Sequence, residues 1–137
     1  MTDAIIDTHV LAWSLIDPDR LPVRVRDLME SGITLHVPPC SLHEITLKVR
    51  KGRWEAMAPH ADQLDSLCMA QGFRIAPYTA KMAMMAGSMD WDHPDPFDRM
   101  IATTAIEMAC LLISKDSVFD GLAGREKWKG RIWNRAF

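Results

Sequence analysis

Short apolar runs that alternate with longer segments of helical periodicity are the main pattern of this chain. The apolar runs are candidate strands and lie at residues 4–6, 33–37, 73–76, 110–114 and 131–133. Between them, apolar side chains recur every three or four residues, which is typical of amphipathic helices. This alternation predicts an α/β fold with a central, mainly parallel sheet of four to five strands.

Proline and glycine residues indicate where the intervening helices begin and end. Ser41 is the expected N-cap of one helix, because Pro38-Pro39 breaks the strand before it. Pro59 is expected to begin the next helix and Gly72 to end it. The expected helices cover residues 10–16, 22–31, 41–50, 59–71, 79–89 and 95–108.

Length and composition restrict the class of protein. The 137 residues, 48% of them hydrophobic and 25% charged, suit a single globular domain over residues 1–137. The chain has neither a signal-peptide pattern at its N-terminus nor an apolar run near the ~20 residues that a bilayer requires, so we expect a cytoplasmic protein without a membrane partner. The cysteines, Cys40, Cys68 and Cys110, are widely spaced and are expected to be buried thiols.

Four acidic residues stand where an α/β fold places its functional groups. Asp7 and Asp116 each follow an apolar strand, Glu44 lies near the start of the helix after the second strand, and Asp98 lies in the first turn of the helix at residues 95–108. The carboxyl ends of parallel strands share one edge of the sheet, and the helices that follow them begin there. We therefore expect the four carboxylates to converge on one cleft.

Converging carboxylates indicate a metal site. They repel one another unless a cation holds them, and oxygen ligands without a matching cysteine or histidine set favour Mg²⁺, with Mn²⁺ as the alternative. Such ions activate water and stabilise the charge that develops on a phosphodiester during cleavage. The net charge of -2 does not by itself indicate nucleic-acid binding.

Each acid except Asp7 also has a simpler structural explanation. Asp98 could complete a capping box with Asp95, and Glu44 could form an exposed helical ion pair with Lys48. Asp116 could cap the turn that follows it. Asp7 ends an apolar strand, which is a poor position for an acid if stability alone matters.

The segments around these acids resemble PIN-domain nucleases, and most closely the VapC-type ribonuclease toxins of bacterial toxin–antitoxin pairs. The matching stretches are IDTHVLAW at 6–13, SLHEITLK at 41–48, DPFDRMIA at 95–102 and LISKD at 112–116. The resemblance implies a three-layer α/β/α fold, Mg²⁺-dependent cleavage of RNA, inhibition by a small cognate antitoxin and a homodimer. It marks as the metal-binding, catalytic set Asp7, Glu44, Asp98 and Asp116.

The same resemblance suggests supporting residues. Thr8 is expected to support the site through its hydroxyl, and Arg99 to orient an acid or contact phosphate. The other candidates for supporting or RNA-contacting roles are Ser41, Lys48, Asp95 and Ser114. The chain departs from its relatives at Ser114, where threonine is common, at Pro38-Pro39-Cys40, and at His93-Pro94, where a basic residue is common.

Further patterns leave alternatives open. Basic runs beside Trp54 and Trp128 fit either phosphate contacts or solvated faces over a packed tryptophan. The methionines of residues 82–89 fit core filling better than a dimer or antitoxin surface. The alternative function is a non-catalytic α/β protein-binding or phosphoacceptor module. A phosphoacceptor needs an acidic pair near the first strand, whereas Asp7 is followed by Thr8-His9.

Overall fold

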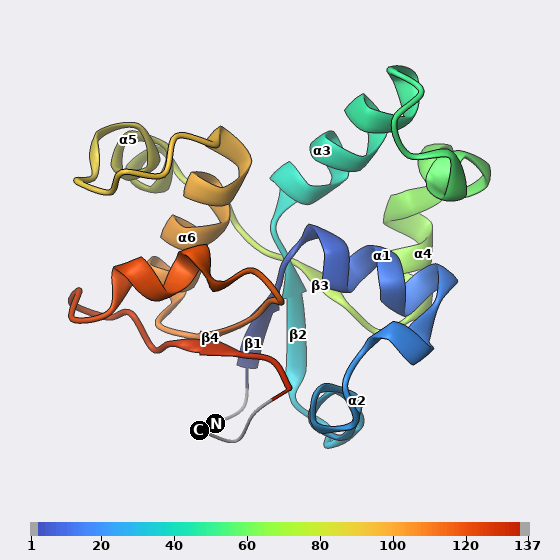
Figure 1. Cartoon of the computed structure of the whole chain (residues 1–137), viewed down its shortest axis with the longest axis horizontal. Coiled ribbons are helices and arrows are strands. Elements are labelled where there is room, and N and C mark those ends of the chain that lie inside the picture. The colour runs from blue at the N-terminus through green and yellow to red at the C-terminus, as the bar shows by residue number, and fades with distance from the viewer. Residues whose placement is uncertain (1–2, 135–137) are drawn as a thin grey trace.

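A five-stranded parallel sheet forms the centre of the computed structural model, which describes residues 3–134 (Figure 1). The strand order is β3-β2-β1-β4-β5, and each neighbouring pair is parallel. The α/β class and the parallel sheet expected from the sequence are therefore confirmed. The strands are β1 (Asp3–Ile6), β2 (Thr34–Val37), β3 (Arg74–Ile75), β4 (Leu111–Ile113) and β5 (Arg131–Ile132).

Helices connect the strands, as the periodicity predicted. Gly32, Gly52 and Gly72 follow the ends of three of them with positive φ angles of 91°, 69° and 81°, a conformation that glycine adopts at little cost. The α-helices are α1 (Thr8–Ile16), α2 (Val23–Glu30), α3 (Pro39–Arg50), α4 (Leu64–Ala70), α5 (Ala80–Ser88) and α6 (Pro96–Met108). The 3₁₀ segments are η1 (Pro18–Arg20), η2 (Glu55–Gln63) and η3 (Ser117–Leu122).

The predicted start of α3 was wrong. Ser41 is not its N-cap, because the helix already begins at Pro39 with Pro38 in the capping position. A proline suits the first helical turn, where its missing N–H would have had no intrahelical acceptor. The earlier start places Ser41 inside the helix, fully buried and facing α1.

The predicted start of α4 was also wrong. Pro59 does not begin an α-helix but lies inside η2, and the α-helix starts only at Leu64. A proline ring removes one amide donor and clashes with the carbonyl four residues earlier. The segment around Pro59 therefore winds as short 3₁₀ turns.

The two faces of the sheet carry separate apolar cores. Ala4 and Ile6 of β1 pack with α1, α3 and α4, whereas Ile5 packs with α6 and η3 on the opposite face. This division follows from the alternation of side chains along a strand. Helices thus cover both faces of the sheet, which gives the three layers that the family resemblance implied.

Other sequence expectations have mixed outcomes. Met82 is buried, as core filling requires, but Met84 on the same helix is 74% exposed. Cys40, Cys68 and Cys110 are free thiols, and burial raises the pKa of Cys40 to about 12. Within residues 3–134, no helix is both long and apolar enough to cross a membrane.

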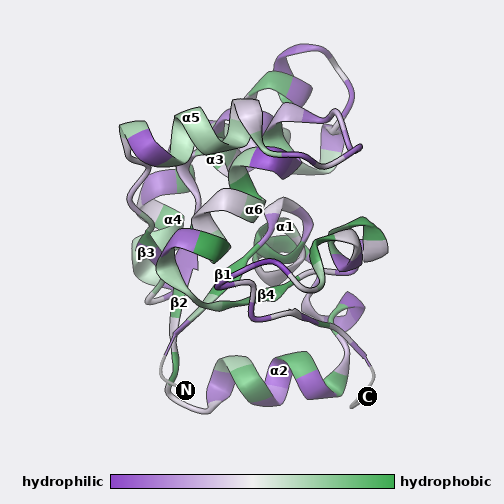
Figure 2. Cartoon of the chain, turned by 90° about the vertical axis from the view of Figure 1, so that its left-hand side faces the viewer, coloured by the Kyte–Doolittle hydropathy of each residue, from purple (hydrophilic) through white to green (hydrophobic). Residues whose placement is uncertain are grey.

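The carboxyl edge of the sheet lies below the amino ends of two helices. Figure 1 shows α3 and α6 beginning close together beyond the ends of β1 and β2, and the two helices contact each other. The amphipathic helix α2 lies at the other end of the molecule (Figure 2). Side chains from β1, α3 and α6 therefore meet at one edge.

Candidate metal centre

The predicted acids lie in one cleft at the carboxyl edge of the sheet. Asp7 comes from the end of β1, Glu44 from α3, Asp98 from the first turn of α6, and Asp116 from the loop after β4. The cleft has a volume of about 170 Å³. Its lining residues are Asp7, Thr8, His9, Glu44, Lys48, Asp95, Asp98, Ile101 and Asp116.

Asp7 is one of the two buried acids of the cleft, together with Glu44. It is 7% exposed, and its Oδ1 accepts a hydrogen bond of 3.0 Å from the amide of Val10, so that it also caps α1. Burial raises the pKa of Asp7 to about 6; a hydrogen bond from Ser114 opposes the rise, and the charges of Asp98 and Glu44 add to it. A cation beside Asp7 would stabilise its ionised form.

Glu44 is buried and has a partner for each oxygen. Thr8 Oγ1 lies 2.7 Å from Glu44 Oε1, and Lys48 Nζ lies 2.7 Å from Oε2. Ser41 Oγ lies 2.9 Å from Thr8 Oγ1, and since the Thr8 proton goes to the carboxylate, Ser41 donates to Thr8. The ion pair with Lys48 exists, but Glu44 is only 7% exposed, so the expectation of an exposed pair was wrong.

Asp98 does not form the capping box that the sequence left open. Asp95 caps α6, since its Oδ1 accepts hydrogen bonds from the amides of Phe97 (2.8 Å) and Asp98 (3.3 Å). The Asp98 carboxylate instead lies 2.6 Å from His93 Nε2. Burial raises the pKa of Asp98, and the hydrogen bond with His93 opposes this rise.

Asp116 lines the cleft, and Ser114 lies behind it in contact with Asp7 and Asp116. The Ser114 hydroxyl is fully buried; it accepts a 3.0 Å hydrogen bond from the amide of Asp116 and donates to the Asp7 carboxylate. The more exposed Asp116 caps η3, since its Oδ1 accepts from the Val118 amide at 3.0 Å. One Asp116 oxygen therefore has a structural partner while the residue still lines the cleft.

Arg99 does not have the role that the sequence suggested. Its guanidinium donates to four main-chain oxygens, those of Ala86, Met89, Trp91 and His93, at 2.6–2.9 Å. These bonds hold the segment between α5 and α6 against α6. With four N–H bonds committed to carbonyls, Arg99 makes no direct hydrogen bond to an acid of the cleft and offers no free fork to phosphate.

The closest group of metal-ligand atoms includes a histidine that the sequence analysis did not select. In the described part of the chain, the atoms of three such residues lie within 4.8 Å of one another in one place: His93, Asp95 and Asp98. The four predicted acids share the cleft without forming a group that tight. The signal for His93 was its position five residues before Asp98, with Pro94 turning the chain between them.

The donor set suits a divalent cation. Carboxylate oxygens dominate the cleft, an imidazole nitrogen lies beside them, and burial leaves Asp7 and Asp98 with raised pKa values. Hard oxygen donors of this kind are those that Mg²⁺ and Mn²⁺ prefer. The residues present therefore fit the metal that the resemblance implies.

The tryptophans of the two basic runs are packed against the cores. Trp54 packs on the α1 side of the sheet and Trp128 on the α6 side. This agrees with the interpretation of solvated charges over a packed ring. Only the first run reaches the cleft, through Lys48, whose Nζ also lies 5.5 Å from the centre of the Trp54 ring.

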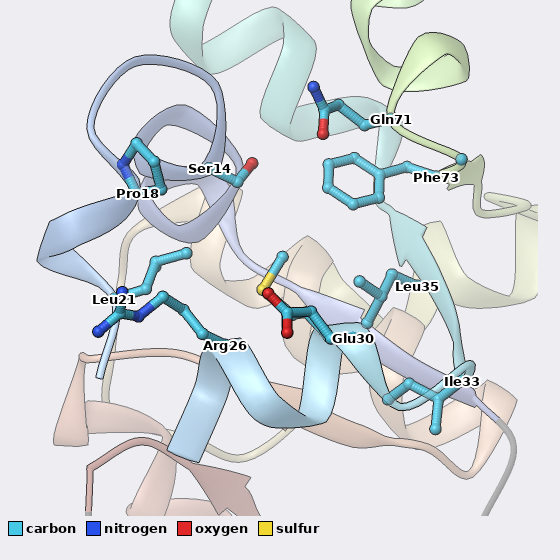
Figure 3. Close-up of a pocket in the computed structure, with 11 residues that line it drawn as sticks. Ser14, Pro18, Leu21, Arg26, Glu30, Ile33, Leu35, Gln71 and Phe73 are labelled. Carbon is cyan, nitrogen blue, oxygen red and sulfur yellow. The ribbon is translucent and has the colours of Figure 1, made fainter. Parts of the chain in front are cut away.

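A separate hollow of about 280 Å³ lies between α1, α2, β2 and the end of α4. Figure 3 shows Leu21, Leu35 and Phe73 around it, with Arg26 and Glu30 projecting from α2. Glu30 is the one carboxylate in its lining. This hollow therefore lacks the set of carboxylates that the acidic cleft offers to a metal ion.

Comparisons with known proteins agree with this fold and show the family of the chain. The family model of the PIN domain matches residues 4–125. The chain is 31% identical over 117 residues to Ribonuclease VapC22 of Mycobacterium tuberculosis (strain ATCC 25618 / H37Rv), which covers 85% of this chain and 88% of that protein. Its fold is similar to a chain in the crystal structure of VapBC2 from Rickettsia felis bound to a promoter DNA fragment. That match has a TM-score of 0.62 and 16% identity, over 96% of this chain and 98% of the other.

Proposed function

Because the chain belongs to the PIN domain family and is of its VapC type, we propose that it is an Mg²⁺-dependent endoribonuclease. The observation that carries this proposal is the single cleft lined by Asp7, Glu44, Asp98 and Asp116. A stable fold has no need for four carboxylates from different elements around one cavity, since their mutual repulsion costs free energy. A metal-dependent nuclease needs that arrangement.

In this proposal the four acids hold the metal and their neighbours position them. Thr8 and Lys48 fix the two oxygens of Glu44, and Ser114 fixes Asp7. Ser41 supports Thr8, while Asp95 caps the helix that presents Asp98. When bound there, Mg²⁺ or Mn²⁺ would supply activation of a water nucleophile and stabilisation of the negative charge on the phosphodiester.

We further propose the biological setting that VapC relatives suggest. The chain acts in the cytoplasm as the toxin of a toxin–antitoxin pair, and a small cognate antitoxin inhibits it. Residues 1–137 function as one nuclease domain, and two copies form a homodimer. The exposed Met84 on α5 is a candidate contact residue in the dimer interface. The supporting observation is the 31% identity to a VapC ribonuclease over most of both chains.

Cleavage of RNA by the purified protein tests the enzymatic proposal. We expect RNA to be cut with Mg²⁺ or Mn²⁺ and to remain intact with EDTA. Asp98→Asn should lower the cleavage rate by roughly 100-fold or more, because it removes a ligand charge and metal affinity with it. The matched control is Asp27→Asn, which removes an exposed carboxylate on α2, outside the cleft.

Three results would contradict this assignment. Cleavage at the parent rate by Asp98→Asn would remove Asp98 from the catalytic set. An RNA-cutting activity that persists in EDTA would remove the metal from the mechanism. A protein that cuts no RNA in any metal, yet folds, would favour the alternative of a non-catalytic protein-binding module.

Growth of bacteria that express the chain tests the toxin role separately. Expression without an antitoxin should arrest growth, because uncontrolled RNA cleavage depletes translation. The Asp7→Asn variant, which lacks the buried acid, should permit growth at the same expression level. Equal growth of both cultures would argue against the toxin role and leave the nuclease chemistry in place.

A further inference from the structure

The acidic cleft opens into a second hollow with a different lining. This neighbouring hollow has a volume of about 420 Å³. It shares Asp7, His9 and Asp116 with the acidic cleft, so that the two form one continuous depression. The residues that only the second hollow contributes are Trp13, Lys115 and Ser117, and we call this part the His9–Trp13 hollow.

Aromatic rings build one wall of the His9–Trp13 hollow. The exposed His9 ring makes tilted contacts with two tryptophans, with its centre 5.5 Å from Trp13 and 5.1 Å from Trp54. Trp13 is itself backed by Trp133 at 6.0 Å. His9 is therefore an exposed aromatic residue that tryptophans support and that lines both hollows beside the acids.

Two cations lie against the Trp13 ring, and one of them, Lys115, also lines the hollow. Lys115 Nζ lies 5.8 Å and the Arg20 guanidinium carbon 4.8 Å from the centre of the Trp13 ring. Within residues 3–134 neither cation has a carboxylate within ion-pair distance, whereas Lys48 is paired with Glu44 at 2.7 Å. Lys115 and Arg20 are thus positive charges that the protein itself does not neutralise by direct contact.

We propose that the His9–Trp13 hollow binds the nucleotide of a single-stranded RNA substrate next to the phosphate held in the acidic cleft. In this arrangement the base stacks on the His9 ring, and Lys115 and Arg20 contact the adjoining phosphate. The inference rests on the proposed ribonuclease function, because it assigns a substrate subsite to the same active site. It adds two residues, Lys115 and Arg20, that no part of that proposal uses, and gives His9 a role.

The chemistry of the two hollows is complementary to a nucleic-acid strand. An aromatic surface stacks any base, and an unpaired cation binds a backbone phosphate. The acids alone would repel the strand, so cations beside them are required to hold the phosphates that the metal does not contact. The two hollows are continuous. One RNA strand can therefore place a phosphate in the acidic cleft and the adjacent nucleotide in the His9–Trp13 hollow.

RNA binding without cleavage tests this subsite. The measurement is the fluorescence anisotropy of a short, fluorescein-labelled, single-stranded RNA of random sequence, titrated with protein that carries Asp98→Asn. In this background we expect His9→Ala to raise Kd roughly tenfold, the equivalent of about 1.4 kcal/mol. His9→Phe keeps an aromatic ring and should stay within about twofold of the parent.

A charge variant and its matched control test the phosphate contact. Lys115→Gln should raise Kd by roughly fivefold and reduce the dependence of log K on log salt by about 0.7, the value for one single-strand phosphate. Lys129→Gln removes an equally exposed charge just before β5, at the amino edge of the sheet. Its Kd and salt dependence should match those of the parent.

A strand without bases separates stacking from charge. With an abasic strand of the same length, the His9→Ala effect should disappear and the Lys115→Gln effect should persist. Unchanged binding by both variants, or equal effects of Lys115→Gln and Lys129→Gln, would overturn the subsite. Since this readout needs no cleavage, an enzyme that cuts RNA but binds it equally in all variants refutes the subsite alone. A protein that binds as described but never cuts RNA refutes only the proposed activity.

Discussion

Individual acids of the cleft occupy positions that destabilise the metal-free fold. Asp7 is the clearest case, because it ends a buried strand and most of its surface is withdrawn from water. Its hydrogen bonds from Val10 and Ser114 offset only part of the cost, since burial still raises its pKa to about 6. A residue that destabilises the metal-free fold is what a metal ligand is expected to be.

The unfavourable burial of the Asp7 charge predicts that Asp7→Asn changes the free energy of unfolding in EDTA in a pH-dependent way. Native Asp7 keeps its proton up to about pH 6, while the unfolded chain loses it near pH 3.8. The free energy of unfolding of the parent protein therefore falls as the pH rises through this window. Asparagine still caps α1 and carries no charge. At about pH 8 the variant should be more stable by up to roughly 3 kcal/mol, and at about pH 3 the two proteins should be alike.

Urea denaturation at the two pH values measures this difference. A variant less stable than the parent at about pH 8 would show that the ionised Asp7 is compensated in the native state without metal. Adding Mg²⁺ or Mn²⁺ should stabilise the parent more than Asp7→Asn, because binding to the native state alone shifts unfolding.

At the scale of elements, the amino ends of α1, α3 and α6 decide where the acids lie. Asp7 caps α1, Pro38 and Pro39 set the start of α3, and Asp95 with Pro96 sets the start of α6. Arg99 then fixes the segment before α6 through four carbonyls, which include that of His93. The position of Asp98 and His93 therefore depends on a residue that does not line the cleft.

Replacing Arg99 should reveal this dependence. Arg99→Gln removes charge-assisted hydrogen bonds to four half-buried carbonyls and should lower the free energy of unfolding by roughly 3 kcal/mol. Arg99→Lys keeps the charge but loses the planar fork, so it should recover less than about half of that loss. The control is Arg53→Gln, an exposed position after α3, with an expected change within about 0.5 kcal/mol.

Urea denaturation in EDTA gives these values without a contribution from metal binding. Equal stability of Arg99→Gln and Arg53→Gln would show that the carbonyl contacts of Arg99 are not stabilising. In that case Arg99 would not be the residue that holds the segment around His93 in place.

The elements were largely predictable because their signals are local. Apolar runs marked the strands, and glycines at 32, 52 and 72 marked helix ends, since these positions need positive φ. The errors at Ser41 and Pro59 both concern prolines. Pro39 begins α3 two residues before Ser41, and Pro59 lies within a 3₁₀ segment instead of beginning an α-helix. The role of Arg99 was not predictable, because its acceptors are main-chain carbonyls, which every residue possesses.

At the scale of the whole molecule, parallel topology converts distant sequence positions into one site. Residues 7, 44, 98 and 116 are far apart in the chain, but each follows a strand or lies in the first two turns of a helix at the carboxyl edge. Their convergence could therefore be predicted before any distance was known. The pairing of His93 with Asp98 and the ring stack around His9 depend on loop paths and rotamers, which carry no such periodic signal.

The location of a bound Mn²⁺ tests the central claim most directly. Crystals of the protein soaked in Mn²⁺ should give an anomalous difference peak in the cleft, within coordination distance of Asp7 and Asp98 oxygens, of roughly 2.0–2.3 Å. Asp98→Asn crystals soaked in the same way should lose most of that peak. A parent map in which Mn²⁺ binds only outside the cleft, or binds in the cleft of both proteins alike, would contradict the account.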